Sequence, residues 1–312
     1  MNIFSERDII RIFKELLNDP YPLEDVGIVD YGENRVILNI DTFVESTDAP
    51  SNMDHYYMGW KAVVASISDL YVKGVKPLGL TISLCLPNLD IEKIRSIAHG
   101  IKGACNRYGL KVYKWDTNKS IELSISVACI GITKRSIPLR SGLKMGDLLL
   151  VSDTFGLETL GLKILLGEIV IEDKKIKELA ISRFLQPSPD FNKLLKIYKE
   201  HYLSIHAAID SSDGLAKSLW ELSKSSNKKI KLLNIPVDPQ LYKLNLSKKT
   251  ILELALYGGE EYQAIISVDK TIRNYLIKLG FIEIGRICGR GIGVYDNEGH
   301  LIEDRGWEHF KN

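Results

Sequence analysis

The amino-acid sequence indicates a mixed α/β protein in which helices cover a sheet. Short segments rich in Val and Ile alternate along the chain with longer amphipathic segments. The 312 residues are enough chain for two medium-sized domains. A polar turn that contains glycine, at residues 140–147, separates two stretches of similar composition. We therefore expect one domain over residues 1–137 and a second α/β domain over residues 138–312.

Strands and helices alternate in the first half. Ser5 is suited to cap an amphipathic helix that runs to about Leu17. Branched apolar residues predict a strand at 35–44 and another between two prolines at 78–86. Segments that end at glycine predict buried or amphipathic helices. These helices cover residues 57–74 and 91–108, and further strands are expected at 111–113 and 122–133.

The second half begins with a predicted strand at 147–152. Helices are expected at 157–167, 174–184, 190–201 and 215–225, with a strand at 204–209. From Glu261 onward the pattern predicts a strand, a helix and two more strands. The glycine cluster at 289–293 lies between these last two strands and predicts a hairpin turn.

Composition excludes several classes of protein. Lys and Arg number 41 and Asp and Glu number 40, so a net charge of +1 gives no reason to expect nucleic acid or an acidic membrane as partner. Hydrophobic content of 45% argues against disorder. The N-terminus has no signal-peptide pattern, and no apolar run approaches the roughly 18 residues of a membrane span. Four scattered cysteines fit reduced thiols, so we expect a cytoplasmic protein.

Common catalytic motifs are absent from the sequence. It contains no GxxxxGK[ST], no HExxH and no GxSxG. The six histidines have no metal-ligand spacing. A P-loop, a zincin site and a nucleophile elbow are therefore excluded.

Aspartates at the edges of apolar segments are the informative feature. Asp41 interrupts a strand and Asp69 lies within an apolar helix, where aspartate is unfavourable and costly to bury unpaired. Asp116 follows a strand, and Asp210 and Asp213 end another. Asp213 is also suited to cap the helix after Gly214, and Asp25 also suits a turn.

A cluster of these carboxylates would require bound cations. Two like charges about 4 Å apart repel by roughly 4 kcal/mol at an effective dielectric constant near 20. Several such pairs would offset much of a domain stability of about 5–15 kcal/mol. Oxygen ligands favour Mg²⁺ or Ca²⁺ over zinc, and Mg²⁺ held by carboxylates is commonly completed by substrate phosphates. Convergence would thus indicate phosphoryl transfer, although spacing alone leaves convergence open.

A series of short motifs resembles the thiamine-monophosphate kinase family of the AIR-synthase-related (PurM-like) ATP-binding superfamily. The similarity runs in order over nearly the whole chain. Its motifs are Glu24-Asp25, Asp41-Thr42-Phe43-Val44-Glu45, the GxKA…SDL…GxxP pattern over 59–77, Ser83 to Pro87, Arg140-Ser141-Gly142 with Gly146-Asp147, Asp210 to Leu215, Gly258-Gly259-Glu260-Glu261-Tyr262 and Gly306 to Phe310.

The resemblance implies an AIR-synthase-like protein with two α/β domains that forms a homodimer through its N-terminal sheets. It implies transfer of the ATP γ-phosphoryl group to thiamine monophosphate, with ATP and several Mg²⁺ ions in the site. The implied metal ligands are Asp25, Asp41, Asp69, Asp116, Asp210 and Asp213. The resemblance implies catalytic roles for Asp116, Arg140 and Asp213. It implies that ATP is bound by Asp116, Arg140 and Ser212, and that the thiamine part is faced by Asp48, Glu260 and Trp307. The acceptor is an anionic phosphate oxygen, so no general base is required.

The sequence departs from the family pattern at several positions. Lys114-Trp115 replaces Gly-Gly, and glycine lets a backbone approach phosphate closely. Glu24, Asn39-Ile40, Asp48 and Ser66 are also changed. Taken alone, Arg140 equally suits a surface turn, and Trp307 suits packing of the C-terminus onto the core. Two alternatives therefore stay open: another ATP-dependent small-molecule enzyme of the superfamily, and a non-catalytic nucleotide-binding relative.

Overall fold

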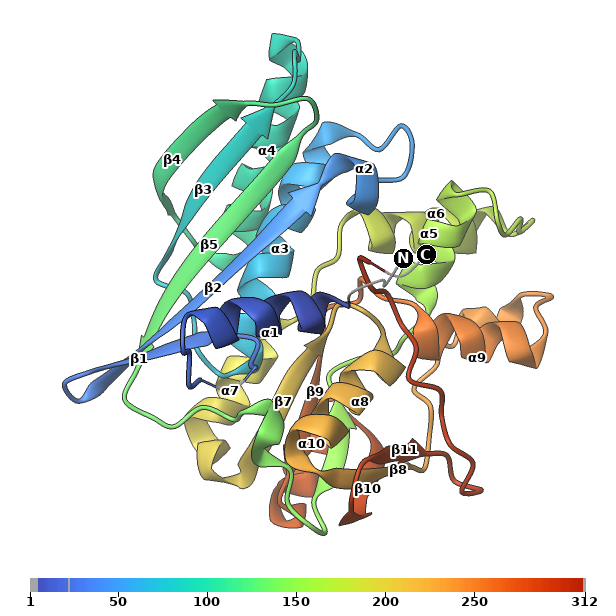
Figure 1. Cartoon of the computed structure of the whole chain (residues 1–312). Helices are drawn as coiled ribbons and strands as arrows, with labels where there is room; N and C mark the ends of the chain where they lie inside the picture. The colour runs from blue at the N-terminus through green and yellow to red at the C-terminus, as the bar shows by residue number, and fades with distance from the viewer. Residues whose placement is uncertain (1–4, 22, 311–312) are drawn as a thin grey trace.

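The computed structural model describes residues 5–21 and 23–310 and contains two sheets flanked by helices (Figure 1). The first sheet has the order β1-β2-β5-β3-β4, in which β3 and β4 are parallel and the other neighbours antiparallel. Its strands are β1 (Gly27–Tyr31), β2 (Asn34–Val44), β3 (Gly79–Leu86), β4 (Val112–Lys119) and β5 (Ser124–Thr133).

The second sheet has the order β11-β8-β10-β6-β9-β7. Its neighbours are antiparallel except for β11 and β8. Its strands are β6 (Leu148–Val151), β7 (Ile205–Ser211), β8 (Lys228–Leu232), β9 (Gln263–Val268), β10 (Ile282–Arg290) and β11 (Gly293–Tyr295).

The helices of the described residues fall into two sets. The first half holds α1 (Glu6–Leu16), α2 (Glu45–Asp48), α3 (His55–Val72) and α4 (Ile91–Tyr108). The second half holds α5 (Leu157–Leu165), α6 (Lys174–Leu185), α7 (Phe191–His201), α8 (Leu215–Ser226), α9 (Lys248–Tyr257), α10 (Arg273–Lys278) and short 3₁₀ turns at 140–142, 202–204, 241–243 and 270–272. Within the described ranges, none of these helices combines the length and apolar character that a membrane crossing requires.

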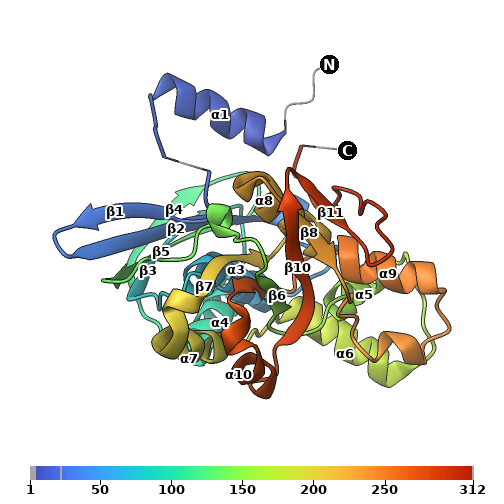
Figure 2. The same ribbon diagram turned by 90° about the horizontal axis from the view of Figure 1, so that it is seen from below.

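The first sheet is covered on one face and open on the other. Helix α3 packs on β2 and β5, and α4 packs on α3, so both helices lie on the same side of the sheet (Figure 1). A Cβ on Gly100 would lie 1.8 Å from the Tyr56 carbonyl oxygen, so glycine lets the two helices meet backbone to backbone. Helix α1 stands on the opposite side of the sheet, away from α3 and α4 (Figure 2).

The hydrophobic core continues from the first half into the second. Residues of β6, β7 and β9 that face the first half share one buried cluster with α3 and the covered face of the first sheet. The alternate residues of these strands pack under α5, α8 and α9. The chain crosses between the two sheets in the segment after Thr133, which includes the predicted boundary at residue 138. A division into two independent domains stays a prediction.

Most predicted elements are present, including the mixed α/β class and the helix cap at Ser5, whose side chain accepts from the Asp8 N–H. Two expectations about the strands are wrong. Asp116 lies in the middle of β4 and does not follow a strand, because the polar segment through Lys119 pairs with β3. The glycine cluster at 289–293 does not close a hairpin, because β8 lies between β10 and β11 and pairs with both.

Candidate active site

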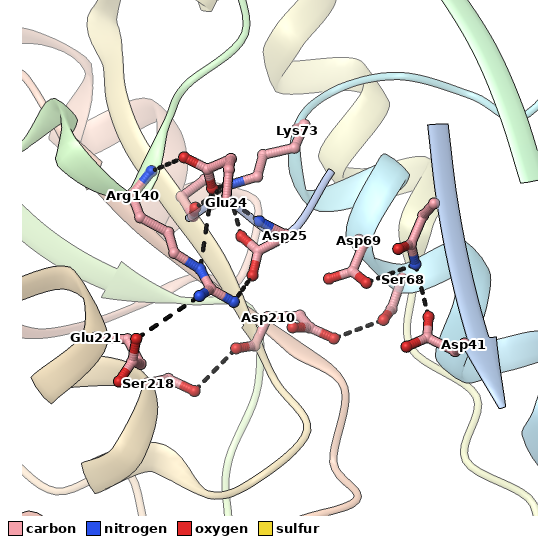
Figure 3. Close-up of polar contacts among 12 residues, drawn as sticks. Glu24, Asp25, Asp41, Ser68, Asp69, Lys73, Arg140, Asp210, Ser218 and Glu221 are labelled. Carbon is pink, nitrogen blue, oxygen red and sulfur yellow. Dashed lines mark hydrogen bonds and ion pairs between the residues drawn. The ribbon is translucent and has the colours of Figure 1, made fainter. Parts of the chain in front are cut away.

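Helix α3 and strand β7 bring acidic side chains together at the junction of the two halves (Figure 3). Asp210 lies on the face of β7 that also carries Ala208, whose side chain packs toward α3. The Ser68 hydroxyl on α3 donates to Asp210 Oδ2 at 2.5 Å. Asp69 follows directly on α3. The apolar residues around these positions bury α3 and so place its polar side chains at the junction.

Asp25, Asp69 and Asp210 converge. Each offers a carboxylate oxygen, and these oxygens lie within 4.8 Å of one another. Asp41 extends the group from β2, because the Asn39 amide donates to Asp41 Oδ2 at 2.6 Å and to Asp69 Oδ2 at 2.7 Å. Four of the six predicted metal ligands therefore share one site.

Two cations hold the Glu24-Asp25 pair. Lys73 Nζ lies 2.7 Å from Glu24 Oε1, 2.7 Å from Asp25 Oδ2 and 2.7 Å from the Ala208 carbonyl oxygen. Its side chain is fully buried, donates hydrogen bonds to Glu24 and to the Ala208 carbonyl oxygen, and forms an ion pair with Asp25. The Arg140 guanidinium pairs with Asp25, and the Arg140 N–H donates to Glu24 Oε2 at 2.8 Å. Arg140 is thus part of the site and not a surface turn residue.

Burial and mutual repulsion raise the pKa values of the acidic groups. Burial, with the nearby charges of Asp210 and Asp41, raises the pKa of Asp69 well above its usual range. Burial raises the pKa of Asp210, against the hydrogen bond from Ser68. Burial raises the pKa of Asp41 to about 6 and that of Asp213 to about 7. The protein thus holds several carboxyl groups that resist ionisation without a cation.

Asp213 lies beside this group, in the turn between β7 and α8. The N-cap position of α8 is Gly214, at φ +111°, and no side chain caps the helix, so the interpretation of Asp213 as an N-cap is wrong. The Trp307 N–H donates to the Asp213 carbonyl oxygen at 3.0 Å, and the indole is half exposed. The neighbouring Ser212 carbonyl oxygen accepts from the Glu260 N–H at 2.7 Å. These contacts therefore place four of the predicted site residues close together: Ser212, Asp213, Glu260 and Trp307.

Asp116 and Asp48 are placed differently. The strand register aligns Asp116 with Ser83, Ser126 and Thr42 on the open face, whereas Asp41 shares the covered face with Val127. Within one chain the carboxylates of Asp116 and Asp41 point to opposite faces of the sheet. Asp48 ends α2, where its carboxylate accepts from the Val44 N–H at 2.7 Å and the Thr47 hydroxyl at 2.8 Å.

Sequence reasoning missed Lys73 and the bridging role of Asn39. A signal for Lys73 was available: like Asp69, it is a charged residue between apolar neighbours, in Tyr71-Val72-Lys73-Gly74-Val75. Asn39 was noted only as a departure from the family pattern. Its amide, which joins two carboxylates, has no signature in the sequence because it depends on the packing of β2 against α3.

Comparison with known proteins decides the family. Residues 23–133 match the family described as AIR synthase related protein, N-terminal domain. The chain is 32% identical to the thiamine-monophosphate kinase of Nitrosopumilus maritimus, with all of both chains covered, and 32% identical to that of Aquifex aeolicus, with 98% of each covered. The chain belongs to the thiamine-monophosphate kinase family. This membership confirms the resemblance and the expectation of a phosphotransferase.

Solved structures agree with the family and the fold. AaThiL complexed with AMPPCP and TMP superposes with a TM-score of 0.87 at 30% identity, covering 98% of this chain and 97% of that one. The HypE-HypF complex superposes with a TM-score of 0.74 at 20% identity, which shows a shared fold alone. The AIR-synthase-like fold expected from the sequence is thus confirmed.

Proposed function

We propose that this protein transfers the γ-phosphoryl group of ATP to thiamine monophosphate and forms thiamine diphosphate and ADP, with Mg²⁺ held by its aspartates. The observation that carries the proposal is the convergence of Asp25, Asp69 and Asp210 within 4.8 Å. Membership of the thiamine-monophosphate kinase family supports the choice of acceptor. The related AaThiL was solved with AMPPCP, an analogue of ATP, and with TMP, which supports both substrates.

The donor set fits a hard divalent cation. The converging groups are carboxylates with oxygen donors, which suit Mg²⁺, and burial has raised the pKa values of Asp69 and Asp210. The metal would be held by Asp25, Asp41, Asp69, Asp210 and Asp213. When bound, Mg²⁺ supplies neutralisation of the phosphate charge and orientation of the transferred group. Asp116 is proposed as a further ligand that acts from the open face.

The chain's own residues would align the two substrates. Arg140 lies at the edge of the acidic group with 21% of its side chain exposed, so its guanidinium can donate to ATP phosphate oxygens. Ser212 is proposed as a second contact to ATP. The acceptor phosphate of thiamine monophosphate is already anionic, so the site requires no general base. Glu260 and the exposed indole of Trp307 are proposed to face the thiazolium cation, and Asp48 is proposed to contact the thiamine part.

The open face of the first sheet supports a homodimer. Leu38 and Ile40 of β2 align with Ile130 and Ala128 of β5 on this face, and the three larger side chains are exposed. Ile132 continues the row and is also exposed. An apolar sheet face of this kind is a suitable surface for a second copy of the chain.

The product assay tests the proposal. Purified protein is incubated with ATP, Mg²⁺ and thiamine monophosphate, and thiamine diphosphate is separated and quantified. We expect product with the natural chain and a loss in kcat/KM of about 100-fold or more for Asp210→Asn. Asp30→Asn, at an exposed position on β1, is the matched control and should keep full activity. ATP consumption without thiamine diphosphate would contradict the acceptor and favour another reaction of the superfamily.

A further inference from the structure

Lys61 is a buried lysine that the proposed chemistry leaves without a role. It lies in the first half of α3 and is 1% exposed. Its Nζ is 2.5 Å from Glu260 Oε2 and 3.7 Å from the centroid of the Phe184 ring. A buried ammonium requires a counterion, because removing a charge from water is costly. The counterion here is Glu260, from the opposite half of the chain.

Glu260 is held from several sides in a strained loop. The Tyr262 hydroxyl donates to the same oxygen, Oε2, at 3.0 Å. Glu260 and Tyr262 have φ values of +76° and +52°, which are unfavourable for residues other than glycine. Their N–H groups donate to the carbonyl oxygens of Ser212 and Ser211, at 2.7 and 2.9 Å. With one oxygen held by Lys61 and Tyr262, 27% of the Glu260 side chain stays exposed beside Ser212.

We propose that Lys61 is a positioning residue for the thiamine end of the acceptor, acting through Glu260. Its ammonium fixes one carboxylate oxygen of Glu260, so that the exposed part of this carboxylate is presented in one orientation to a cationic ring. This inference rests on the proposed function, which assigns Glu260 to the thiamine side. It adds a residue that never touches the substrate.

Helix α3 links the contact between Lys61 and Glu260 to the acidic group. Lys61 and Ser68 are seven residues apart, so they lie on the same face of the helix, about 10 Å apart along its axis. Lys61 contacts Glu260, and Ser68 contacts Asp210. One rigid helix thus sets the distance between a candidate metal ligand and a candidate ligand of the thiazolium. An acceptor with a phosphate at one end and a cation at the other requires such a fixed spacing.

Steady-state kinetics of five variants test the inference. We expect Lys61→Met to raise KM for thiamine monophosphate by about tenfold, with kcat and KM for ATP changed less than about twofold. Lys61→Arg should restore most of the loss. In the Glu260→Gln background, adding Lys61→Met should change this KM by less than about twofold, because the effect of Lys61 passes through Glu260. Lys102→Met, at an exposed position of α4, is the matched control.

Other outcomes overturn the inference. Equal rises in KM for both substrates, or additive effects of Lys61→Met and Glu260→Gln, would assign Lys61 to general stability. If Lys61→Met does not fold, Tyr262→Phe replaces it, and an unchanged KM for thiamine monophosphate would then count against the proposal. Failure of the proposed function is separate, because the natural chain would itself form no thiamine diphosphate. In that case thermal melting tests the ion pair between Lys61 and Glu260. If the losses in melting temperature of Lys61→Met and Glu260→Gln add up in the double variant, the ion pair is refuted.

Discussion

Asp210 combines a proposed role in metal binding with a cost to stability. It is buried, and burial raises its pKa, so its ionised form is disfavoured in the metal-free protein. We predict that Asp210→Asn raises the free energy of unfolding in EDTA at pH 7.5 by about 1 kcal/mol, because asparagine carries no charge and can still accept from Ser68. Urea titration measures this change. A destabilised variant would contradict the electrostatic account.

Burial of carboxyl groups also predicts that the stability of the metal-free protein depends on pH. The pKa values of Asp41 and Asp213, about 6 and about 7, lie above the ordinary value near 3.9. A raised carboxyl pKa means that the folded protein binds protons more tightly than the unfolded chain, so metal-free stability falls as pH rises from about 4 to 7. Mg²⁺ binds the ionised groups and removes this cost.

We therefore predict that Mg²⁺ raises the melting temperature little at pH 5 and substantially at pH 7.5. Thermal melts with Mg²⁺ and with EDTA at both pH values check this prediction. Asp210→Asn serves as the control, because it should reduce the rise at pH 7.5. An equal effect of Mg²⁺ at both pH values would mean that these carboxyl groups do not bind the metal.

Helix α3 is the element that organises the site, since its last turn carries Asp69 and its C-cap residue is Lys73. We predict that Lys73→Met lowers the free energy of unfolding in EDTA by about 3 kcal/mol, because Glu24 and Asp25 lose a buried counterion. Lys76→Met, at an exposed position three residues on, should change it by less than about 0.5 kcal/mol. Similar losses in both variants would show that Lys73 acts only through helix packing.

Elements with strong local signals were predictable from the sequence. Helix α4 begins after Asp90, whose side chain accepts from the Lys93 N–H, and ends at Gly109 in the left-handed region, as its pattern indicates. Strand β8 was missed and β4 was predicted too short. Their lysines and other polar residues hide the apolar alternation that marks a strand. Pairing with a neighbouring strand, which no local pattern encodes, forms both.

The candidate site was predictable in part, through the placement of its aspartates. Asp41 and Asp69 stood out because charge is unusual between apolar neighbours, and the structure brings both to the junction. Lys61 and Lys73 carry the same signal, and their roles depend on which loops fold back over α3. Contacts of this kind join residues that lie far apart along the chain. Local pattern alone therefore could not identify the cations that balance the acidic group.

Within one chain, one of the six predicted metal ligands lies away from the candidate active site. Asp116 lies on the open face of the first sheet, with Ser83 and Thr42 in its row, whereas the converging aspartates lie on the covered side. The proposed homodimer would use the apolar part of that open face. Asp116 would then lie at or beside the interface, where it can act on the site of the other copy.

Mixing two inactive variants tests this arrangement. We expect Asp116→Asn and Asp213→Asn each to lose activity as homodimers. After unfolding and refolding an equal mixture, heterodimers should carry one intact site, which needs Asp213 of one chain and Asp116 of the other. The mixture should recover about a quarter of the natural activity, because about half of the dimers are mixed and each has one working site. Analytical ultracentrifugation confirms that dimers re-form. If Asp116 acts on its own chain, both sites of the heterodimer are defective, and the mixture stays inactive.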